Sequence, residues 1–179
     1  MSDGAPLVER ACDAMLILAD EKSWRDITLR EIAEKAGIPL PDLFELAHGK
    51  SALLEQFSAR LDRAALATAA TPSDDVHDRL FDAAMARVEA MEPHRSALLA
   101  IHGGGLIPVL PHLPRTARAI LEAAGVDATP PRLAAMTAVW ARIAQVWAAD
   151  TGALNRTMAE IDKRLKQMRN RLERVGAGF

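Results

Sequence analysis

The sequence predicts an all-α fold of about nine helices, and three observations support this prediction. Apolar residues recur every three or four positions along most of the 179 residues, which is the spacing of one helix face. Half of the residues are apolar, which is enough to build a sizeable core. The chain has no run of alternating apolar and polar residues of the kind that predicts a half-buried strand.

Three helices are expected in an N-terminal head formed by residues 1–50. The first helix ends near Lys22. Thr28 begins the second helix, because Thr28 and Glu31 have the spacing of a capping box. Gly37 ends this helix, because glycine readily adopts the left-handed conformation of a helix terminus.

The third helix is expected to begin near Leu40. Pro39 and Pro41 fix this start, since proline is tolerated only before a helix or in its first turn. A longer connecting helix follows over about residues 50–70 and leads into a helical body that comprises residues 51–179.

The body begins with a turn-rich junction over residues 69–75. Apolar periodicity then predicts helices over residues 76–91, 94–101 and 116–124. Glycines and prolines between the last two predict a kinked connection over residues 102–114.

The two final helices carry the longest apolar patterns. The first begins after Pro130 and Pro131, and the second repeats apolar residues at alternating steps of four and three, as a heptad seam does. Together they are expected to form a four-helix homodimer interface. The residues assigned to this interface are Val139, Ile143, Trp147, Leu154, Met158, Ile161 and Leu165.

The composition limits the chemistry that the protein can perform and the cellular compartment in which it can be expected. The one cysteine, Cys12, cannot form an intrachain disulfide, which fits a reducing cytoplasm. The N-terminus does not have the pattern of a secretory signal, and no apolar stretch is long enough to span a bilayer, so a cytoplasmic protein is predicted. Residues typical of catalysis or metal binding do not occur at the required spacings, so no enzyme, metal site or cofactor is predicted.

Residues 27–54, ITLREIAEKAGIPLPDLFELAHGKSALL, resemble the helix-turn-helix of TetR/AcrR-type transcriptional regulators. The shared positions are Thr28, Leu29, Ile32, Ala33, Ala36, Gly37 and Lys50. The resemblance covers about the first 65 residues and implies a DNA-binding head, a helical ligand-binding body and a homodimer. The positions that it places at double-stranded DNA are Thr28, Arg30, Pro39, Leu40, Asp42, Phe44, His48 and Lys50.

Several of these positions depart from the family pattern. Pro39 and Asp42 stand where the family usually has a small hydroxyl residue, and Phe44 lacks the hydroxyl of the usual tyrosine. Glu45 replaces a polar or basic residue, and a carboxylate is repelled by phosphates. Residues 1–71 carry 12 acidic against 8 basic residues, a net charge of −4, whereas phosphate binding favours an excess of basic residues.

Residues 80–101 and 145–167 are similar to TetR-like proteins related to ubiquinone-biosynthesis accessory proteins, which bind lipids or isoprenoids. Large or pliable apolar residues on several helices of the body predict a pocket for an apolar or lipid-like ligand, although ordinary core is the alternative for each. The residues assigned to this pocket are Phe81, Met85, Leu98, Leu99, His102, Met136 and Trp140.

These features predict a dimeric DNA-binding regulator, specifically a repressor, that is controlled by a small apolar ligand. The alternative is a lipid- or isoprenoid-binding accessory protein of the same fold whose head does not bind DNA. A third interpretation is a protein-interaction module. The basic residues of the final helix are interpreted as a solvated face, and the alternative is a surface that approaches anionic lipid.

Overall fold

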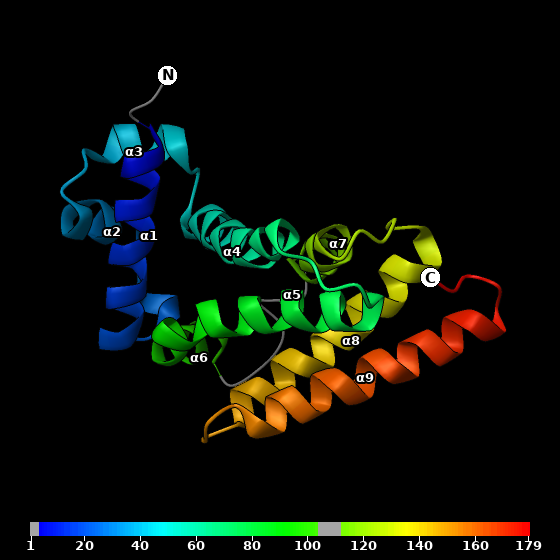
Figure 1. The fold of residues 1–179 in the computed structure, drawn as a ribbon. Helices are drawn as coiled ribbons and strands as arrows, with labels where there is room; N and C mark the ends of the chain where they lie inside the picture. Colours follow the sequence, from blue (N-terminus) through cyan, green and yellow to red (C-terminus); the bar gives the residue numbers. More distant parts are fainter. Residues whose placement is uncertain (1–3, 104–111) are drawn as a thin grey trace. The chain divides into compact units, whose positions relative to one another are not determined.

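The computed structural model describes residues 4–103 and 112–179 (Figure 1). These residues form nine α-helices and three short 3₁₀ helices without a strand, which confirms the expected all-α fold. Most of the connection expected over residues 102–114 lies outside the described residues. No described helix combines the length and the apolar character that crossing a membrane requires. The α-helices are α1 (Gly4–Glu21), α2 (Leu29–Ala36), α3 (Leu40–Leu46), α4 (Lys50–Ala67), α5 (Val76–Met91), α6 (Arg95–His102), α7 (Leu113–Ala123), α8 (Pro130–Ala149) and α9 (Asn155–Arg174).

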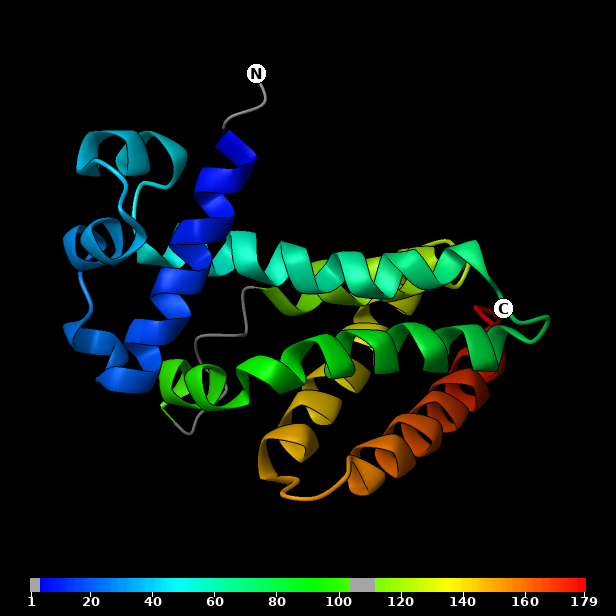
Figure 2. The ribbon, with the colours of Figure 1, turned by 60° about the vertical axis from the view of Figure 1, so that its left-hand side comes forward.

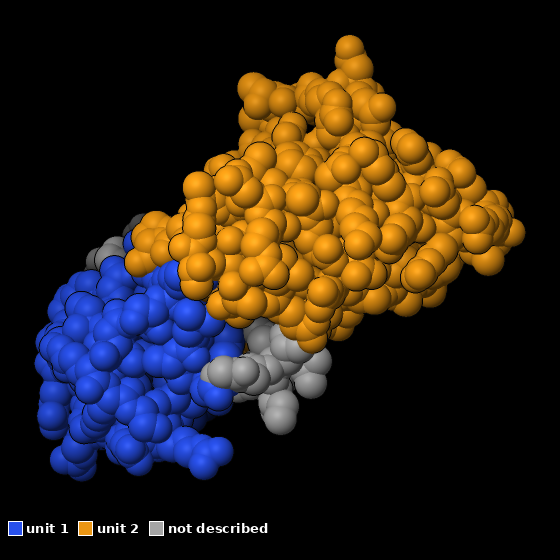
Figure 3. All heavy atoms as spheres, turned by 90° about the horizontal axis from the view of Figure 1, so that it is seen from below, with its two compact units in different colours: residues 1–60, 94–108 blue, residues 61–93, 109–179 orange. Residues whose placement is uncertain are grey.

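The chain forms two compact units, which Figure 3 shows in different colours. Unit 1 comprises Met1–Arg60 and His94–Pro108, and unit 2 comprises Leu61–Pro93 and Val109–Phe179. This division differs from the expected boundary at residue 50, since α4 is shared between the units and α6 belongs to unit 1.

Local contacts explain why unit 1 extends beyond the expected head. The part of α4 that belongs to unit 1 is bound to α1 by the ion pair of Arg60 and Asp13, at 2.9 Å, and by a Cys12 thiol that donates to the Leu53 carbonyl. Helix α6 packs on α1 and on the 3₁₀ helix Trp24–Asp26. The sequence periodicity locates these helices but does not specify their partners.

The core of unit 1 is built from one apolar stripe on each helix. Met15, Ile32, Leu43, Leu53 and Phe57 contribute from α1 to α4, and each is at most 1% exposed. Burying such a side chain stabilises the fold by roughly 1.5–3 kcal/mol. Helices α2 and α3 have only 8 and 7 residues and would not be stable alone, so this packing holds them in place.

The expected capping box and left-handed turn are both present at α2. The Glu31 amide donates to Thr28 Oγ1 at 3.3 Å, and the Thr28 amide donates to Glu31 Oε2 at 2.9 Å. Gly37 has a φ of 64°, and the Ile38 amide donates back to the Ala33 carbonyl at 2.9 Å. This closed turn sets the direction in which the chain leaves α2 and enters α3.

Unit 2 is a helical bundle in which α8 and α9 run side by side in opposite directions (Figures 1 and 2). Helix α5 packs on α7 and α9, and α7 packs on α8. The buried Asp150 carboxylate fixes the start of α9, because it accepts from both the amide and the hydroxyl of Thr157, at 3.0 and 2.9 Å.

Candidate functional site

Helix α3 is held by one face and exposes the other. Leu43 is fully buried and anchors the helix to the core of unit 1. Pro39, Asp42 and Glu45 are exposed, and Phe44 is 52% exposed although it is a large apolar residue. The positions assigned to DNA on this helix therefore lie at the surface, apart from Leu40, which is half-buried.

Lys50 does not extend into solvent as a phosphate contact would. Its ammonium group donates to the carbonyl oxygens of Trp24, Arg25 and Ile27, the last two at 3.3 and 2.8 Å. The same group lies 4.7 Å from the centre of the Trp24 ring, in cation–π geometry. An ammonium group has three N–H donors, so these carbonyls occupy all of them.

The surroundings of Lys50 also act on its charge. Burial lowers the pKa of Lys50, and the nearby carboxylates of Asp26 and Glu31 oppose this effect. The charge is thus held partly inside the head, where it binds the end of the 3₁₀ helix Trp24–Asp26. Lys50, which the family resemblance assigned to DNA, thus serves as an internal tie: it binds backbone carbonyl oxygens of residues 24–27 within the head.

Other basic side chains of unit 1 are engaged in the same way. Arg10 donates to the carbonyl oxygens of Ala36 and Gly37, the second at 3.0 Å, and thereby braces the turn before α3. Ion pairs engage three more of them, Lys22 with Glu31, Lys35 with Glu21, and Arg60 with Asp13. Each of these cations thus has a carboxylate beside it that competes with a phosphate group.

Two cations of the head remain open to solvent. The side chains of Arg25 and Arg30 are exposed and make no hydrogen bond or ion pair with the described residues. Thr28, which the resemblance also placed at DNA, is engaged in the cap of α2. His48 is exposed and packs edge-on against Phe44, with ring centres 5.3 Å apart.

The seven residues assigned to a ligand pocket do not come together in one unit. Leu98, Leu99 and His102 lie on α6 in unit 1, whereas the other four belong to α5 and α8 in unit 2. In unit 2, Met136 and Trp140 are at most 2% exposed and Met85 is 9% exposed, while Phe81 is half-buried. Helical periodicity indicates which apolar residues face inward but cannot assign them to a unit.

Unit 2 buries a charged cluster that was not predicted from the sequence. Arg87 Nε on α5 donates to Asp62 Oδ1 on α4 at 2.8 Å, and the Thr116 hydroxyl on α7 donates to the same oxygen at 3.0 Å. Both charged side chains are at most 6% exposed. The guanidinium carbon of Arg87 lies 4.8 Å from the centre of the Trp140 ring on α8.

A sequence signal for this cluster exists. Arg87 follows Leu80 and Ala84 at the steps of four and three that mark the buried face of α5, and Met91 continues this face. An arginine at a core position of a helix is rare unless it is paired. The stripe on α5 therefore indicates a buried partner, which the fold supplies as Asp62.

Five of the seven residues assigned to a dimer interface lie instead in the core of a single chain, where at most a small part of each is exposed. Val139, Ile143 and Trp147 are at most 7% exposed, and Ile161 and Leu165 at most 1%. The heptad seam of α9 packs on its own unit, because α8 and α5 cover it.

The ends of the seam depart from the expected helix. Leu154 precedes α9 and has a φ of 60°, so it does not continue the helical face. Met158 is 40% exposed and makes the outer edge of the seam. Trp147 is further fixed within the chain, since its indole Nε1 donates to Glu92 Oε2 at 2.7 Å.

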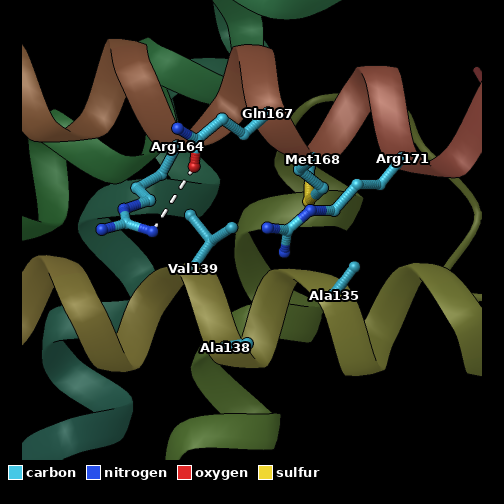
Figure 4. Close-up of a pocket in the computed structure, with 7 residues that line it drawn as sticks. All are labelled: Ala135, Ala138, Val139, Arg164, Gln167, Met168 and Arg171. Carbon is cyan, nitrogen blue, oxygen red and sulfur yellow. Dashed lines mark hydrogen bonds between the residues drawn. The ribbon is translucent and has the colours of Figure 1, made fainter.

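A groove of about 110 Å³ runs between α8 and α9 on the surface of unit 2 (Figure 4). Its floor is apolar, and the side chains of Arg164 and Arg171 extend from α9 toward α8. Arg164 is tied to Glu160 at 2.7 Å and to Gln167 at 3.4 Å. The full lining is Ala135, Ala138, Val139, Arg164, Gln167, Met168 and Arg171.

Next to this groove, α8 exposes a stripe that consists of alanines apart from Gln145. Ala134, Ala138 and Gln145 are exposed and Ala141 is half-buried, and with the exposed Ala148 they alternate by four and three. Small side chains at this spacing allow another helix to approach closely. The stripe was not predicted, because alanine fits a buried face equally well.

No protein-family model and no curated protein matches the chain. Among solved structures, a TetR transcriptional regulator from Rhodococcus sp. RHA1 is similar, with a TM-score of 0.67 and 16% sequence identity. The similarity covers 92% of this chain and 96% of that protein, so it includes both units. At this identity the likeness concerns the fold, and the chain has a TetR-like fold.

Proposed function

We propose that the chain is a dimeric transcriptional regulator that binds DNA through α3 and responds to a small ligand in its helical body. The observation that carries this proposal is the outward face of α3, which is anchored by the buried Leu43 and exposes Asp42, Phe44 and Glu45. A helix of this size fits the major groove of DNA. The TetR-like fold supports the proposal.

In this proposal base contacts carry more of the binding than phosphate contacts do. Asp42 and Glu45 accept hydrogen bonds from cytosine amino groups in the major groove. Arg25 and Arg30 supply phosphate contacts, and Lys50 positions Arg25 by binding its carbonyl oxygen. Because few cations are available, affinity falls less steeply with salt than it does for a protein with about six to ten phosphate contacts.

The dimer in this proposal uses the exposed stripe of α8 and the adjoining groove. A second copy placed on Ala134, Ala138 and Ala141 would cover the groove floor, and two-fold symmetry would bring the same stripe from both subunits together. This interface replaces the buried residues that the heptad pattern had indicated.

A second candidate function is favoured by the pairing of charges in the head. If the ion pairs and the Lys50 tie persist in solution, the head presents the two exposed carboxylates of α3 and little positive charge. The chain would then be a ligand-binding accessory protein of TetR-like fold whose head does not bind DNA. Lipid or isoprenoid ligands belong to this second candidate.

A mobility-shift assay on the DNA upstream of the protein's own gene separates the two candidates. The regulator predicts a retarded complex at low salt that Arg30→Ala weakens by about tenfold, the effect of one lost charge-assisted contact. Lys163→Ala, which removes an exposed cation of α9, serves as the matched control and is expected to leave the complex unchanged. Absence of any complex at low salt would favour the accessory protein.

A further inference from the structure

Positive charge is concentrated in the two final helices of the chain. Helices α8 and α9 together carry nine basic against three acidic residues, a net charge of +6. The rest of the chain carries 13 basic against 21 acidic residues, a net charge of −8. A separation of charge of this kind attracts a partner of negative charge to the two basic helices.

The groove between α8 and α9 places the side chains of two of these cations beside an apolar floor (Figure 4). Val139 and Met168 form that floor, and each is at most 7% exposed. Arg171 is exposed and makes no hydrogen bond or ion pair with the described residues. Arg164 uses two of its five N–H donors on neighbours in α9. Within the described part of the chain, both arginines therefore keep donors for a further carboxylate.

The size of the groove favours the side chains of a partner protein over a small-molecule ligand. Its volume of about 110 Å³ is below the roughly 300–1,000 Å³ of pockets that hold drug-sized ligands. Arg164 and Arg171 lie seven positions apart on α9, which corresponds to about 10.5 Å along the helix axis. A second helix lying along α9 presents carboxylates seven positions apart with the same rise. In an extended peptide this distance spans about three residues, and side chains three positions apart point to opposite faces.

Nucleic acids and anionic membranes fit this face less well than an acidic helix does. The Glu160 carboxylate accepts from both Arg142 and Arg164, at 3.1 and 2.7 Å, and it repels the closely spaced phosphates of a nucleic acid. A surface helix enters a membrane with its apolar face, but α9 buries that face against α5 and α8. A protein helix instead places single carboxylates at the arginines and covers the groove floor with apolar side chains.

We propose that this groove docks an acidic amphipathic helix of a partner protein, whose carboxylates, seven residues apart, pair with Arg164 and Arg171. The inference goes beyond the proposed function, since it adds a competitor for the surface that the proposed dimer covers. A second copy brings the same cations face to face, whereas an acidic helix neutralises them. The competition with the second copy rests on the proposed function, and the docking itself does not.

Two labelled peptides test the partner class by fluorescence anisotropy on the full chain. Each is a designed amphipathic helix of about three heptads, with either glutamate or lysine at the positions that flank its apolar seam. The glutamate peptide is expected to bind at least about tenfold more tightly than the lysine peptide, since several exposed charge pairs change sign. Raising the salt concentration should narrow this difference.

Charge reversal at Arg171 tests the groove itself. Arg171→Glu should weaken binding of the glutamate peptide by about threefold or more, because an attractive exposed pair becomes a repulsive one. The same variant should bind the lysine peptide more tightly than the wild type does. Arg118→Glu makes the same change of charge at an exposed position of α7, and as the matched control it should leave both affinities near those of the wild type. Both positions are exposed, so neither substitution is expected to disturb the fold.

The same titrations name the results that contradict the docking site. Wild-type protein that binds neither peptide, or that prefers the lysine peptide, would overturn the inference. Equal weakening by Arg171→Glu and Arg118→Glu would do the same, since the attraction would then come from net charge alone. So would a complex with duplex DNA or anionic vesicles that Arg171→Glu abolishes while the glutamate peptide stays unbound.

Light scattering coupled to gel filtration separates this inference from the proposed function. Saturating glutamate peptide is expected to convert the dimer to a monomer with one bound peptide. Peptide binding by a chain that is already monomeric would support the docking site and refute the proposed dimer. A dimer that binds no peptide would overturn the inference and leave the proposed dimer standing.

Discussion

The ammonium group of Lys50 lies 4.7 Å from the centre of the Trp24 ring and donates a hydrogen bond to the Trp24 carbonyl oxygen. Two further carbonyl oxygens, of Arg25 and Ile27, complete its contacts. The first residue of α4 thus closes the segment that precedes α2. This tie fastens the start of α4 to the segment between α1 and α2.

Lys50→Met is expected to lower the free energy of unfolding by about 1–3 kcal/mol, because it leaves carbonyl oxygens without a charged donor. Lys163→Met serves as the control, since Lys163 is exposed on α9 and makes no ion pair or hydrogen bond with the described residues, so its effect should stay below about 0.5 kcal/mol. Urea unfolding followed by circular dichroism measures both. Equal effects of the two substitutions would show that Lys50 is not an internal tie.

The pKa of Glu31 predicts a specific acid sensitivity. The Lys22 ammonium and the Thr28 amide lower the pKa of Glu31 from 4.5 to about 2. A carboxyl group with a lower pKa in the folded state stabilises that state above pH 4.5, and this contribution disappears as the pH falls toward 2.

Glu31→Gln is therefore expected to lose less stability than the wild type when the pH is lowered through this range. Urea midpoints at several pH values measure the difference, and Glu34→Gln controls for the change in net charge on the same helix. If the midpoints of the wild type and Glu31→Gln fall in parallel, the capping carboxylate is not responsible.

The seam of α9 is expected to behave as core. Leu165→Ala should destabilise the protein by about 2–5 kcal/mol, since Leu165 is 1% exposed and truncation leaves a cavity. Met158→Ala should cost much less, because Met158 is 40% exposed. Thermal unfolding distinguishes the two. A Leu165→Ala protein that keeps its stability but dissociates would restore the seam as an interface.

The exposed stripe of α8 is expected to mediate dimerisation. Ala138→Glu should convert the dimer to a monomer, because it places a charge and a larger side chain where another helix approaches. Ala159→Glu, at an exposed position of α9, is the matched control. Light scattering coupled to gel filtration reports the masses. A dimer that survives Ala138→Glu would place the interface elsewhere.

The helix ends were predictable because the motifs that define them involve residues that lie close together in the sequence. The capping box of Thr28 and Glu31 and the glycine turn at Gly37 depend on residues within five positions of each other, and both were found as expected. They set the bounds of α2, and Pro39 and Pro41 set the start of α3. The all-α fold follows from helical periodicity along the chain.

The partners of each element were not predictable from periodicity. The stripe of Ile161 and Leu165 indicates that α9 buries one face, but it is the same pattern whether the partner is the same chain or another. Lys50 occupies the position of a phosphate contact in the family pattern, and only the fold reveals the carbonyl oxygens around it. Long-range contacts of this kind, like the pair of Arg87 and Asp62, are set by tertiary packing.

Hydroxyl-radical footprinting on the DNA upstream of the gene tests the central claim most directly. Two outward α3 helices on a two-fold dimer predict two symmetric protected patches about one helical turn, roughly 10 base pairs, or a multiple of it apart. Their protection should be lost when Asp42 and Glu45 are both replaced by alanine. Unprotected DNA at low salt, with a dimer present, would contradict the claim that the head reads DNA.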